Sequence, residues 1–347
     1  MWCSNRTGGE RRKDAIMKIG IMGMHYGHIS GMFHSAVNVP NSEIVGIVES
    51  DDALCEKYTA DHNITRFATL DQMLEKAKPD LVIEGLEHHE KTPVIETCAA
   101  ASVHMLLDKP LCRTTEELQR IKTAVAKNNI KLSTFFTSRS YGAFIALRQA
   151  IQNGDLGDLV SLITTHPHKL GANPPALYFD ADKYVGTFHD LAGHGVDQVR
   201  WLTGAEYTGV HALGTLKKHI DTGLIFDHVQ ASFQLDNGAL ATATADWLTP
   251  NDARSFGDTR FIIMGTEGSA HLRAYADDHV LIVSNKSGTY EPKLPPSTNH
   301  TFVENMIDAL SRGEENSIST DDTLAVANAC ITAEESARQG GKFLSIR

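Results

Sequence analysis

A histidine and an aspartate have the spacing that proton-transfer chemistry needs. His194 lies four residues after Asp190 and three before Asp197, so on a helix all three side chains project from one face. Imidazole, with a reference pKa of about 6.5, takes or gives a proton near neutral pH, as the oxidation of an alcohol to a ketone requires. Gly193 and Gly195 flank the histidine and leave room for a bulky substrate. The structural alternative is a helix-capping Asp190 beside a buried, hydrogen-bonded His194.

Lys109 supplies a cation at the end of a predicted strand. It stands between Asp108 and Pro110, directly after an apolar run. Ligands of open α/β sheets bind at the carboxyl ends of the strands, so the Lys109 ammonium is placed to polarise a substrate oxygen. A solvated loop lysine is the alternative. Together with Asp190 and His194, Lys109 forms the predicted reaction centre.

A turn between the first predicted strand and helix has part of a dinucleotide-binding fingerprint. Gly23 takes the position of the tight-turn glycine, and His25 that of the glycine that lets the backbone approach a pyrophosphate. Gly27 comes one position before the expected third glycine. By itself this pattern describes a plain glycine turn as well as it describes a nucleotide site.

Glu49 strengthens the nucleotide interpretation. It ends the second predicted strand, where an acidic side chain accepts hydrogen bonds from the adenosine ribose hydroxyls. A carboxylate at this position selects NAD over NADP, and the next residues, Ser50, Asp51 and Asp52, provide no Arg or Lys to hold a 2′-phosphate. The alternative is a surface acid at a strand end.

The elements that must position these residues alternate between short β-rich runs and helical patterns, as in a parallel sheet covered by helices. Two helices are predicted to begin with capping boxes, Thr69 with Gln72 and Thr114 with Glu117. The order of elements is that of a Rossmann domain. The predicted strands are 18–22, 43–48, a weak one near Arg66, 81–85, 104–107 and 131–135, and the predicted helices are 28–37, 53–62, 70–76, 93–101 and 116–128.

The pattern changes after Phe136 and predicts an α+β domain rather than a second Rossmann unit. Asp236, Asn237 and Gly238 between two runs of period two give a strong hairpin signal and indicate antiparallel sheet. An irregular stretch over 166–187 precedes the helix that carries Asp190. The predicted elements are helices 143–153, 190–202, 301–311 and 323–339, a strand at 159–165, and hairpin strands at 233–235 and 239–245.

Length and composition limit the class of protein. A chain of 347 residues predicts two domains, and a net charge of -11 argues against nucleic acid or an anionic membrane as the main partner. No run is apolar for long enough to span a membrane. Residues 1–16 are predicted to be a leader outside the folded domains, either disordered or artificially added, with Met17 as a natural start and no apolar signal-peptide core. The cysteines are odd in number and scattered, which indicates a reducing cytoplasm: Cys3, Cys55, Cys98, Cys112 and Cys330.

Taken in order, these motifs resemble the Gfo/Idh/MocA family of oxidoreductases, named after glucose-fructose oxidoreductase, inositol dehydrogenase and MocA. The likeness runs from Met17 nearly to Arg347. Asp108, Lys109 and Pro110 are similar to the family's EKP motif, and 190–197 is similar to its DxGxHxxD helix. The segments 18–27 and 79–84 resemble its opening turn and PDVVVIA strand, and 238–247 and 261–272 resemble its substrate-domain sheet.

The resemblance implies an α/β fold with an NAD-binding Rossmann domain over 17–137. A substrate-binding and oligomerisation domain over 138–347 would contain a large, mostly antiparallel open sheet. The implied reaction moves a hydride between nicotinamide and a carbinol carbon of a sugar, polyol or cyclitol. Lys109 would contact the nicotinamide ribose and the reacting hydroxyl, His194 would be the general acid/base, and Asp190 would hold the substrate or orient the imidazole. The cofactor-binding set is Gly23, His25, Tyr26, Glu49, His88, Asp108 and Lys109.

Departures from the family pattern cluster near the expected nicotinamide. His25 replaces a glycine, Leu86, Glu87 and His88 replace the usual TPN, and Ala192 replaces the glycine of the DxGxH helix. The substrate is not readable, since the polar groups of the irregular stretch suit a hydroxyl-rich or a carboxylated ligand equally well, and an ordinary polar loop is the alternative. The predicted substrate residues are Arg139, His166, His168, Tyr184 and His189, with Lys169 beside them.

Three other functions stay open at this point. A metal-dependent enzyme would use a convergent group of side chains, although only His166 and His168 have compact ligand spacing, so no metal is expected. A non-catalytic sensor of NAD or a sugar would not need the retained reaction centre. Redox-neutral glycoside cleavage would use tightly held NAD without net NADH formation. A homodimer or homotetramer is implied by the resemblance alone. The possible metal group is Glu84, Glu87, His88, His89, His25, His28, His166, His168, His189 and His194.

Overall fold

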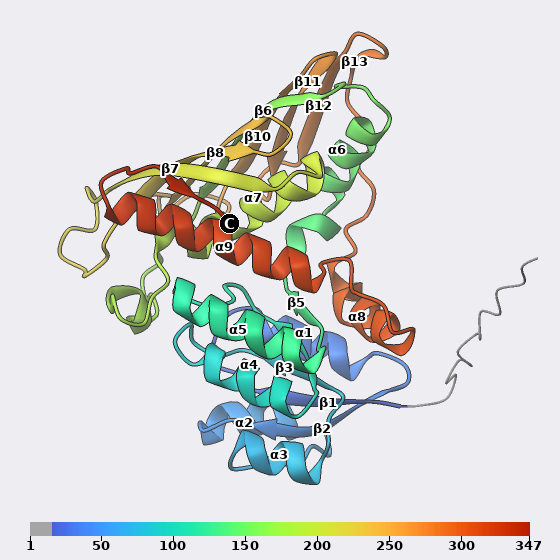
Figure 1. Ribbon diagram of the computed structural model, residues 1–347. Coiled ribbons are helices and arrows are strands. Elements are labelled where there is room, and N and C mark those ends of the chain that lie inside the picture. The colour runs from blue at the N-terminus through green and yellow to red at the C-terminus, as the bar shows by residue number, and fades with distance from the viewer. Residues whose placement is uncertain (1–15) are drawn as a thin grey trace, which may run out of the picture.

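The computed structural model of this chain describes residues 16–347, so the predicted leader, apart from Ile16, lies outside the described residues. Two sheets organise this part of the chain, a parallel sheet built from its first third and a larger sheet built from the remainder (Figure 1). The long helix α9 (Thr320–Arg338) lies between the two sheets. The predicted fold class, an α/β chain with an N-terminal Rossmann domain and a mostly antiparallel second sheet, is confirmed.

The first domain is a five-stranded parallel sheet in the order β2-β1-β3-β4-β5. Its alternating apolar residues face α1 on one side and α4 and α5 on the other, in two separate buried clusters. The weak strand predicted near Arg66 is wrong as a strand, because Arg66 forms only an isolated bridge to Ile47. The elements are β1 (Met17–Met22), α1 (Ile29–Val37), β2 (Ser42–Val48), α2 (Asp52–Thr59), α3 (Leu70–Lys76), β3 (Leu81–Glu84), α4 (Lys91–Ala100), β4 (His104–Leu107), α5 (Thr115–Asn128) and β5 (Leu132–Thr134).

In each of the two predicted capping boxes, only one of the two expected hydrogen bonds forms. The Thr69 and Thr114 hydroxyls accept hydrogen bonds from the backbone amides three residues on, as expected of N-caps. The Glu117 carboxylate, which should return the bond to Thr114, instead accepts one from the Arg113 amide at 2.8 Å and pairs with the Arg113 guanidinium. At Glu117 a local ion pair with Arg113, four residues earlier, therefore replaces the second hydrogen bond of the box.

The second domain is a nine-stranded sheet in the order β13-β12-β11-β10-β6-β9-β8-β7-β14. Only β6 and β9 pair in parallel, and the remaining neighbours are antiparallel. The predicted hairpin is confirmed, with Gly238 at φ +86° in the turn between β8 and β9. The strands are β6 (Leu159–Pro167), β7 (Tyr207–Thr215), β8 (His228–Leu235), β9 (Leu240–Asp246), β10 (Thr259–Gly265), β11 (Gly268–Ala274), β12 (His279–Ser284), β13 (Gly288–Tyr290) and β14 (Leu344–Ser345).

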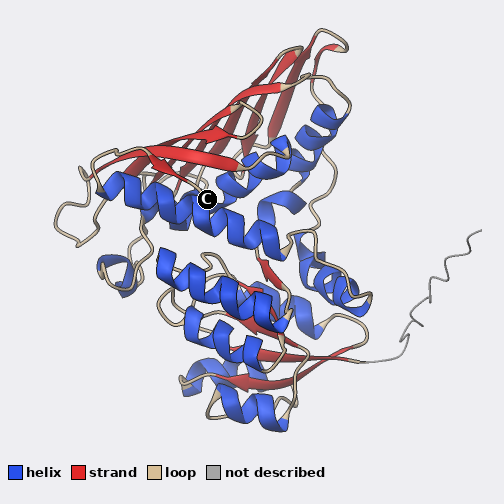
Figure 2. Cartoon of the chain, in the orientation of Figure 1, coloured by secondary structure: helices blue, strands red, loops and turns tan. Residues whose placement is uncertain are grey.

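Helices cover one face of this sheet (Figure 2). They are α6 (Gly142–Gln152), α7 (Thr187–Thr203) and α9, and α7 packs against both the sheet and α9, which itself contacts β7. The opposite face is open and exposes apolar side chains at Ile163, Ile262, Met264 and Val283. None of the helices within 16–347 is long and apolar enough to cross a membrane.

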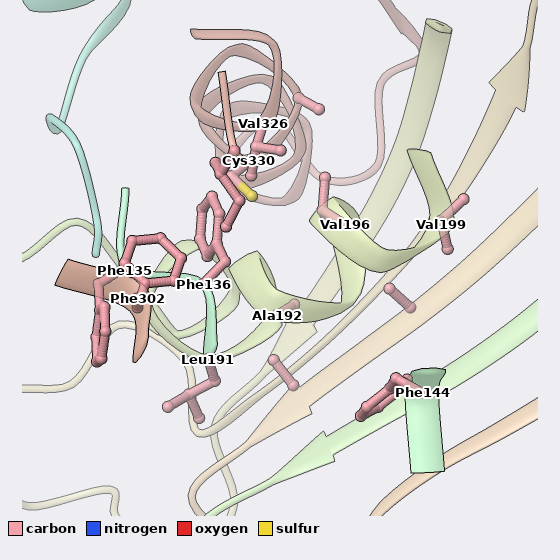
Figure 3. Close-up of a cluster of buried hydrophobic side chains, with 14 of the residues drawn as sticks. Phe135, Phe136, Phe144, Leu191, Ala192, Val196, Val199, Phe302, Val326 and Cys330 are labelled. Atoms are coloured by element: carbon pink, nitrogen blue, oxygen red, sulfur yellow. The ribbon is translucent and has the colours of Figure 1, made fainter. Parts of the chain in front are cut away.

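The C-terminal helices tie the two domains together. α9 also packs against α5 and β5, and α8 (Phe302–Ser311) packs against α1. The Thr134 amide donates to the Thr323 hydroxyl at 3.1 Å across this contact. Figure 3 shows the aromatic rings of Phe135, Phe136 and Phe302 gathered beside the first turns of α7. This packing holds α7 opposite the carboxyl edge of the parallel sheet.

Candidate active site

An ion pair between the two domains forms the centre of the site. The Lys109 ammonium, at the carboxyl end of β4, donates to Asp190 Oδ1 at 2.5 Å and to the Asp190 carbonyl oxygen at 2.8 Å. The Lys109 and Asp190 side chains are only 14% and 1% exposed. Burial by itself raises the pKa of Asp190, but the Lys109 ammonium outweighs burial and lowers this pKa to about 2. Asp190 is therefore an anion whose charge is balanced by the neighbouring domain.

Helix α7, which carries Asp190 and His194, is capped from a distant part of the chain. Its N-cap residue is Gly186, with φ +104° and no side chain to offer. The buried Glu334 carboxylate of α9 takes this role, accepting bonds from the Phe188 and His189 amides at 2.5 and 3.2 Å. A Cβ at Gly186 would lie 2.4 Å from that carboxylate, so only glycine permits the cap. The alternative in which Asp190 caps the helix is wrong, because α7 begins three residues earlier, at Thr187.

His194 is held as a neutral imidazole. Burial, followed by the positive charge of Lys109, lowers the pKa of His194 well below its ordinary value. Its ring packs edge-on against Phe136, with centroids 5.7 Å apart, and against His28 at 6.5 Å. Nδ1 of His194 is buried and has no hydrogen-bond partner among residues 16–347. A neutral ring with an unused nitrogen beside an ammonium group is suited to accept a proton from a hydroxyl.

A chain of aromatic and imidazole rings connects the glycine turn to Asp190. The amide of Val185 donates to His88 Nδ1 at 3.4 Å, which places the His88 proton on Nε2, 2.7 Å from the Tyr26 hydroxyl. The other face of His88 stacks on Tyr184 with centroids 5.6 Å apart. The Tyr184 hydroxyl donates to Asp190 Oδ2 at 3.0 Å. The structure thus brings three of the predicted ligand-contacting residues into one group around Asp190.

A fully buried ion pair supports the sheet edge beneath Lys109. The Lys91 ammonium donates to Glu84 Oε1 at 3.0 Å and to the Asp108 carbonyl at 2.7 Å. The same Glu84 oxygen accepts the Asp108 amide at 3.0 Å, and Oε2 accepts the Leu86 amide at 2.9 Å. Both Lys91 and Glu84 have side chains that are 0% exposed. The pair therefore fixes the backbone on both sides of the strand ends that carry Lys109 and His88.

The glycine turn contains a charged histidine, His25. Gly23 has φ +74°, as the tight turn requires, and its amide donates to the Val48 carbonyl. His25 lies between two carboxylates, with Nδ1 3.4 Å from Glu49 and Nε2 3.1 Å from Glu90. The hydrogen bond to Glu90, with further help from both carboxylate charges, raises the pKa of His25 to about 9. The side chain in the second glycine position is thus an imidazolium at neutral pH.

Glu49 faces the turn rather than open solvent. Its carboxylate accepts the Met24 amide at 2.6 Å and the Asp51 amide at 2.9 Å. Arg66 comes to the same strand end and donates to the carbonyls of Glu49 and Ser50 and to the Asp52 carboxylate. The residues directly after Glu49 include no Lys or Arg, but the fold brings Arg66 beside this strand end.

The turn has the groups that a dinucleotide needs. His28, the N-cap of α1, makes no side-chain cap, so the first amides of the helix keep their hydrogen-bonding capacity for a pyrophosphate. Gly31 in the first turn of α1 has open space at its Cβ position. Glu49, with two oxygens, has acceptor capacity beyond its two amides for ribose hydroxyls. NAD would contribute a hydride acceptor at this edge, next to Lys109.

The predicted substrate residues divide into two groups. His166, His168 and His189 lie near the centre as neutral rings, because burial lowers their pKa values to about 3, 4 and 3. His166 hydrogen-bonds Thr164 at 2.6 Å, whereas Nδ1 of His168 and of His189 has no partner within 16–347.

Arg139, predicted to contact the substrate, is instead bound within the protein. Its guanidinium makes a bidentate pair with Asp197 at 2.8 and 2.6 Å and also donates to the Ser317 carbonyl and to Asp322. Lys169 likewise donates to the Ala253 carbonyl. Every edge of the Arg139 guanidinium is therefore used inside the protein.

The histidines and carboxylates do not converge as metal ligands. Within the described part of the chain, no group of three or more His, Cys, Asp or Glu side chains has an arrangement that could hold a metal ion. The possible metal group named from the sequence is spread instead over the glycine turn, the β3 edge, β6 and α7.

Family models match both halves of the chain. Residues 17–136 match the oxidoreductase family with an NAD-binding Rossmann fold, and residues 144–271 match the GFO/IDH/MocA C-terminal domain. The chain belongs to the Gfo/Idh/MocA family. The resemblance seen in the motifs is thereby confirmed, and with it the oxidoreductase class and NAD as the cofactor.

Relatives of this Gfo/Idh/MocA protein include dehydrogenases. Inositol 2-dehydrogenase of Rhizobium meliloti strain 1021 is 25% identical over 342 residues, which cover 93% of this chain and 98% of the relative. Levoglucosan dehydrogenase of Pseudarthrobacter phenanthrenivorans is 27% identical over 220 residues, which cover 55% of each chain.

Solved structures share the fold. An oxidoreductase from Thermotoga maritima superposes with a TM-score of 0.85 at 23% identity, covering 95% of this chain and 100% of the other. Levoglucosan dehydrogenase in complex with NADH has a TM-score of 0.82 at 19% identity, covering 95% and 99%. At these identities the likeness concerns the fold of this Gfo/Idh/MocA protein, including its mostly antiparallel second sheet.

Three residues that shape the site were missed from the sequence. Glu334 carries a signal that could have been used, since an acidic residue at a position spaced with the buried Cys330 and Ala337 needs a buried partner. Lys91 carries a weaker signal as a lysine shortly after an apolar strand. Arg66 carries none, because its place beside Glu49 depends on the pairing of distant segments.

Proposed function

We propose that this protein oxidises a carbinol carbon of a sugar, polyol or cyclitol and transfers the hydride to NAD, with Lys109, Asp190 and His194 at the reaction centre. The observation that carries the proposal is the buried contact between Lys109 and Asp190, which joins the cofactor-binding edge to the second domain. His194 lies on the same helix as Asp190, beside the lysine ammonium.

The role of each residue in the reaction follows from its charge. Lys109, with its charge balanced by Asp190, donates a hydrogen bond to the reacting oxygen and stabilises the negative charge that develops there. Neutral His194 accepts the hydroxyl proton. The Asp190 carboxylate holds the lysine in place by accepting a hydrogen bond from Lys109 at 2.5 Å, and the Tyr184 hydroxyl fixes that carboxylate by donating to its other oxygen at 3.0 Å. Tyr26, His88 and the glycine turn belong to the cofactor side.

The neutral histidines favour a hydroxyl-rich substrate over a carboxylated one. A carboxylate needs cationic donors, and burial keeps His168, His189 and His194 uncharged at neutral pH. Each has a buried Nδ1 without a partner in the described chain. A hydroxyl both donates and accepts, so it pairs with a neutral imidazole in either tautomer. The names of the relatives, inositol 2-dehydrogenase and levoglucosan dehydrogenase, agree with this class.

The decisive experiment is NADH formation over a panel of sugars, polyols, cyclitols and sugar acids. Neutral polyhydroxy compounds should give turnover and sugar acids should not. Lys109→Met and His194→Asn should each lower kcat by roughly 100- to 10,000-fold, and His194→Asn should retain cofactor binding. The double variant should be little worse than either single one, because both groups act on one oxygen. Lys127→Met, an exposed lysine of α5, is the matched control.

Three outcomes would overturn the proposal. Normal turnover in His194→Asn would exclude His194 from the mechanism. Cleavage of glycosides without net NADH formation would replace the dehydrogenase with the redox-neutral reaction, and cofactor binding without turnover of any compound would favour a sensor.

The open face of the second sheet is the proposed surface for a homodimer or homotetramer. Ile262 and Met264 of β10 are 39% and 40% exposed there, beside Ile163 of β6. Ile262→Arg should shift the protein toward monomer in light scattering. A cytoplasmic location is proposed from the four cysteines of the described chain, which are all buried and unpaired.

A further inference from the structure

His28 occupies the third glycine position of the nucleotide turn and makes a carboxylate–imidazole pair. Its Nδ1 lies 2.8 Å from Asp108 Oδ1, and its amide donates to Asp108 Oδ2 at 2.5 Å. A Cβ at Gly27 would lie 1.6 Å from that second oxygen, so the glycine, with φ +67°, admits the carboxylate. Gly27 therefore serves the contact between His28 and Asp108.

The carboxylate in this pair stays ionised. Asp108 is completely buried, and burial by itself would raise its pKa, but the charge of His28 and the hydrogen bond from its ring outweigh burial and lower it. Asp108 Oδ1 also accepts the Lys109 amide at 2.8 Å. An anionic acceptor at Nδ1 selects the Nδ1–H tautomer of the neutral ring and leaves the lone pair on Nε2.

The His28 ring is a neighbour of the His194 ring and is itself partly exposed to solvent. The two rings are perpendicular with centroids 6.5 Å apart, close enough for one water molecule to bridge them. The Phe135 ring packs against His28 at 5.8 Å. The His28 side chain is 42% exposed, whereas Nδ1 of His194 is buried without a partner in the described chain. His166 and His168 also lie near His194. His166 is buried and bonded to Thr164, so it offers no route outward.

We propose that His28 relays the substrate proton between His194 and solvent, with Asp108 as its positioning residue. This inference rests on the proposed dehydrogenase function. In the oxidation, the C–H hydride goes to NAD and the O–H proton goes to His194. His194 then gives a proton to Nε2 of His28, whose imidazolium is balanced by Asp108, and Nε2 releases it to water. In the reduction the same path runs inward.

The relay removes a proton that is unfavourable at the reaction centre. An imidazolium at His194 would be buried beside the Lys109 ammonium, where both burial and like charge oppose it. His28 has neither disadvantage, since it is partly exposed and paired with a carboxylate. Passing the proton to His28 therefore leaves His194 neutral for the next turnover.

The test combines turnover with chemical rescue. His28→Ala should lower kcat by about 10- to 100-fold, with KM and the Kd for NADH within about twofold of wild type. Added imidazole should restore turnover in a saturable manner, which loss of a purely structural contact would not allow. His34→Gln, an exposed histidine of the same helix, should behave as wild type. Unchanged kcat in His28→Ala, or a loss that imidazole does not rescue, would overturn the relay.

A second measurement needs no substrate. Nitrogen-15 NMR of the histidine rings should find neutral His28 as the Nδ1–H tautomer in wild type, and Asp108→Asn should disturb that preference. An Nε2–H tautomer in wild type would exclude the relay, whether or not a substrate is known. Wild-type protein that turns over no polyhydroxy compound would instead contradict the proposed function, so the two failures are distinguishable.

Discussion

Replacing Lys91 with methionine should destabilise the first domain far more than an ordinary surface substitution. The ammonium and the Glu84 carboxylate it contacts are both 0% exposed, and Lys91 also donates to the Asp108 carbonyl. Lys91→Met keeps much of the side-chain volume but leaves a buried carboxylate without its counter-ion. Removing one partner of a buried pair costs about 3–5 kcal/mol. At about 2–4 °C per kcal/mol, the range for domains of roughly 150–250 residues, the melting temperature should fall by roughly 6–20 °C.

The pH dependence identifies the cause of this loss. Burial already raises the pKa of Glu84, and Lys91 is the main group that opposes the rise. Without Lys91 the pKa of Glu84 in the folded state rises further, so the folded protein binds a proton that the unfolded chain has released. The stability difference between variant and wild type should therefore be largest at pH 8 and shrink toward pH 5, as Glu84 becomes protonated.

Urea unfolding at several pH values, followed by circular dichroism, measures the difference. Glu84→Gln combined with Lys91→Met removes both charges and should recover most of the loss. Arg120→Met, which breaks the exposed pair with Glu96 between α5 and α4, is the matched control and should melt close to wild type. A loss below about 1 kcal/mol in Lys91→Met, or one that does not depend on pH, would refute a buried charged pair.

Three further predictions concern other parts of the site. NAD(H) should bind more tightly than NADP(H) in fluorescence titrations, because Glu49 would face a 2′-phosphate. Glu49→Gln should narrow the difference in affinity between the two cofactors, and Arg66→Ala should weaken the residual binding of NADP(H). Equal affinities in wild type would show that Glu49 does not contact the ribose. Burial raises the pKa of Glu334 to about 7. In denaturant titrations, wild type should therefore lose stability relative to Glu334→Gln as the pH rises from about 4.5 to 7, by at most about 1.4 kcal/mol per pH unit. A difference in stability that does not depend on pH would contradict the raised pKa. Arg139→Met should cost about 3–5 kcal/mol of stability by leaving Asp197 unpaired and should spare NADH affinity; a variant with native stability but weak substrate binding would return Arg139 to the substrate.

Local features of the site were predictable because they depend on short stretches of chain. The four-residue spacing of Asp190 and His194 is sufficient to place them on one face once the segment is helical, and the segment is α7. The turn at Gly23 and the hairpin at Gly238 require positive φ, which glycine permits, and both glycines have it. The position of Lys109 after an apolar run likewise predicts a strand end. These inferences use only backbone periodicity and the conformational limits of individual residues.

The partners of these residues depended on tertiary structure. Lys109 meets Asp190 across 81 positions of sequence, and the Glu334 carboxylate reaches the Phe188 amide across 146. No local pattern distinguishes Arg139, which is satisfied by a buried aspartate, from an arginine that faces a ligand.

By itself, the sequence determined the Rossmann order of elements, the antiparallel character of the second sheet, the family, and the side chains able to exchange a proton or carry a charge. Those properties follow from hydrophobic periodicity, turn chemistry and residue type, which act over a few residues. Only the tertiary structure decided that His194 is neutral, that His25 is charged, and that the partly exposed ring of His28 lies 6.5 Å from that of His194. Protonation and orientation depend on burial and on the distances between charges, and these exist only after the two domains have packed against each other.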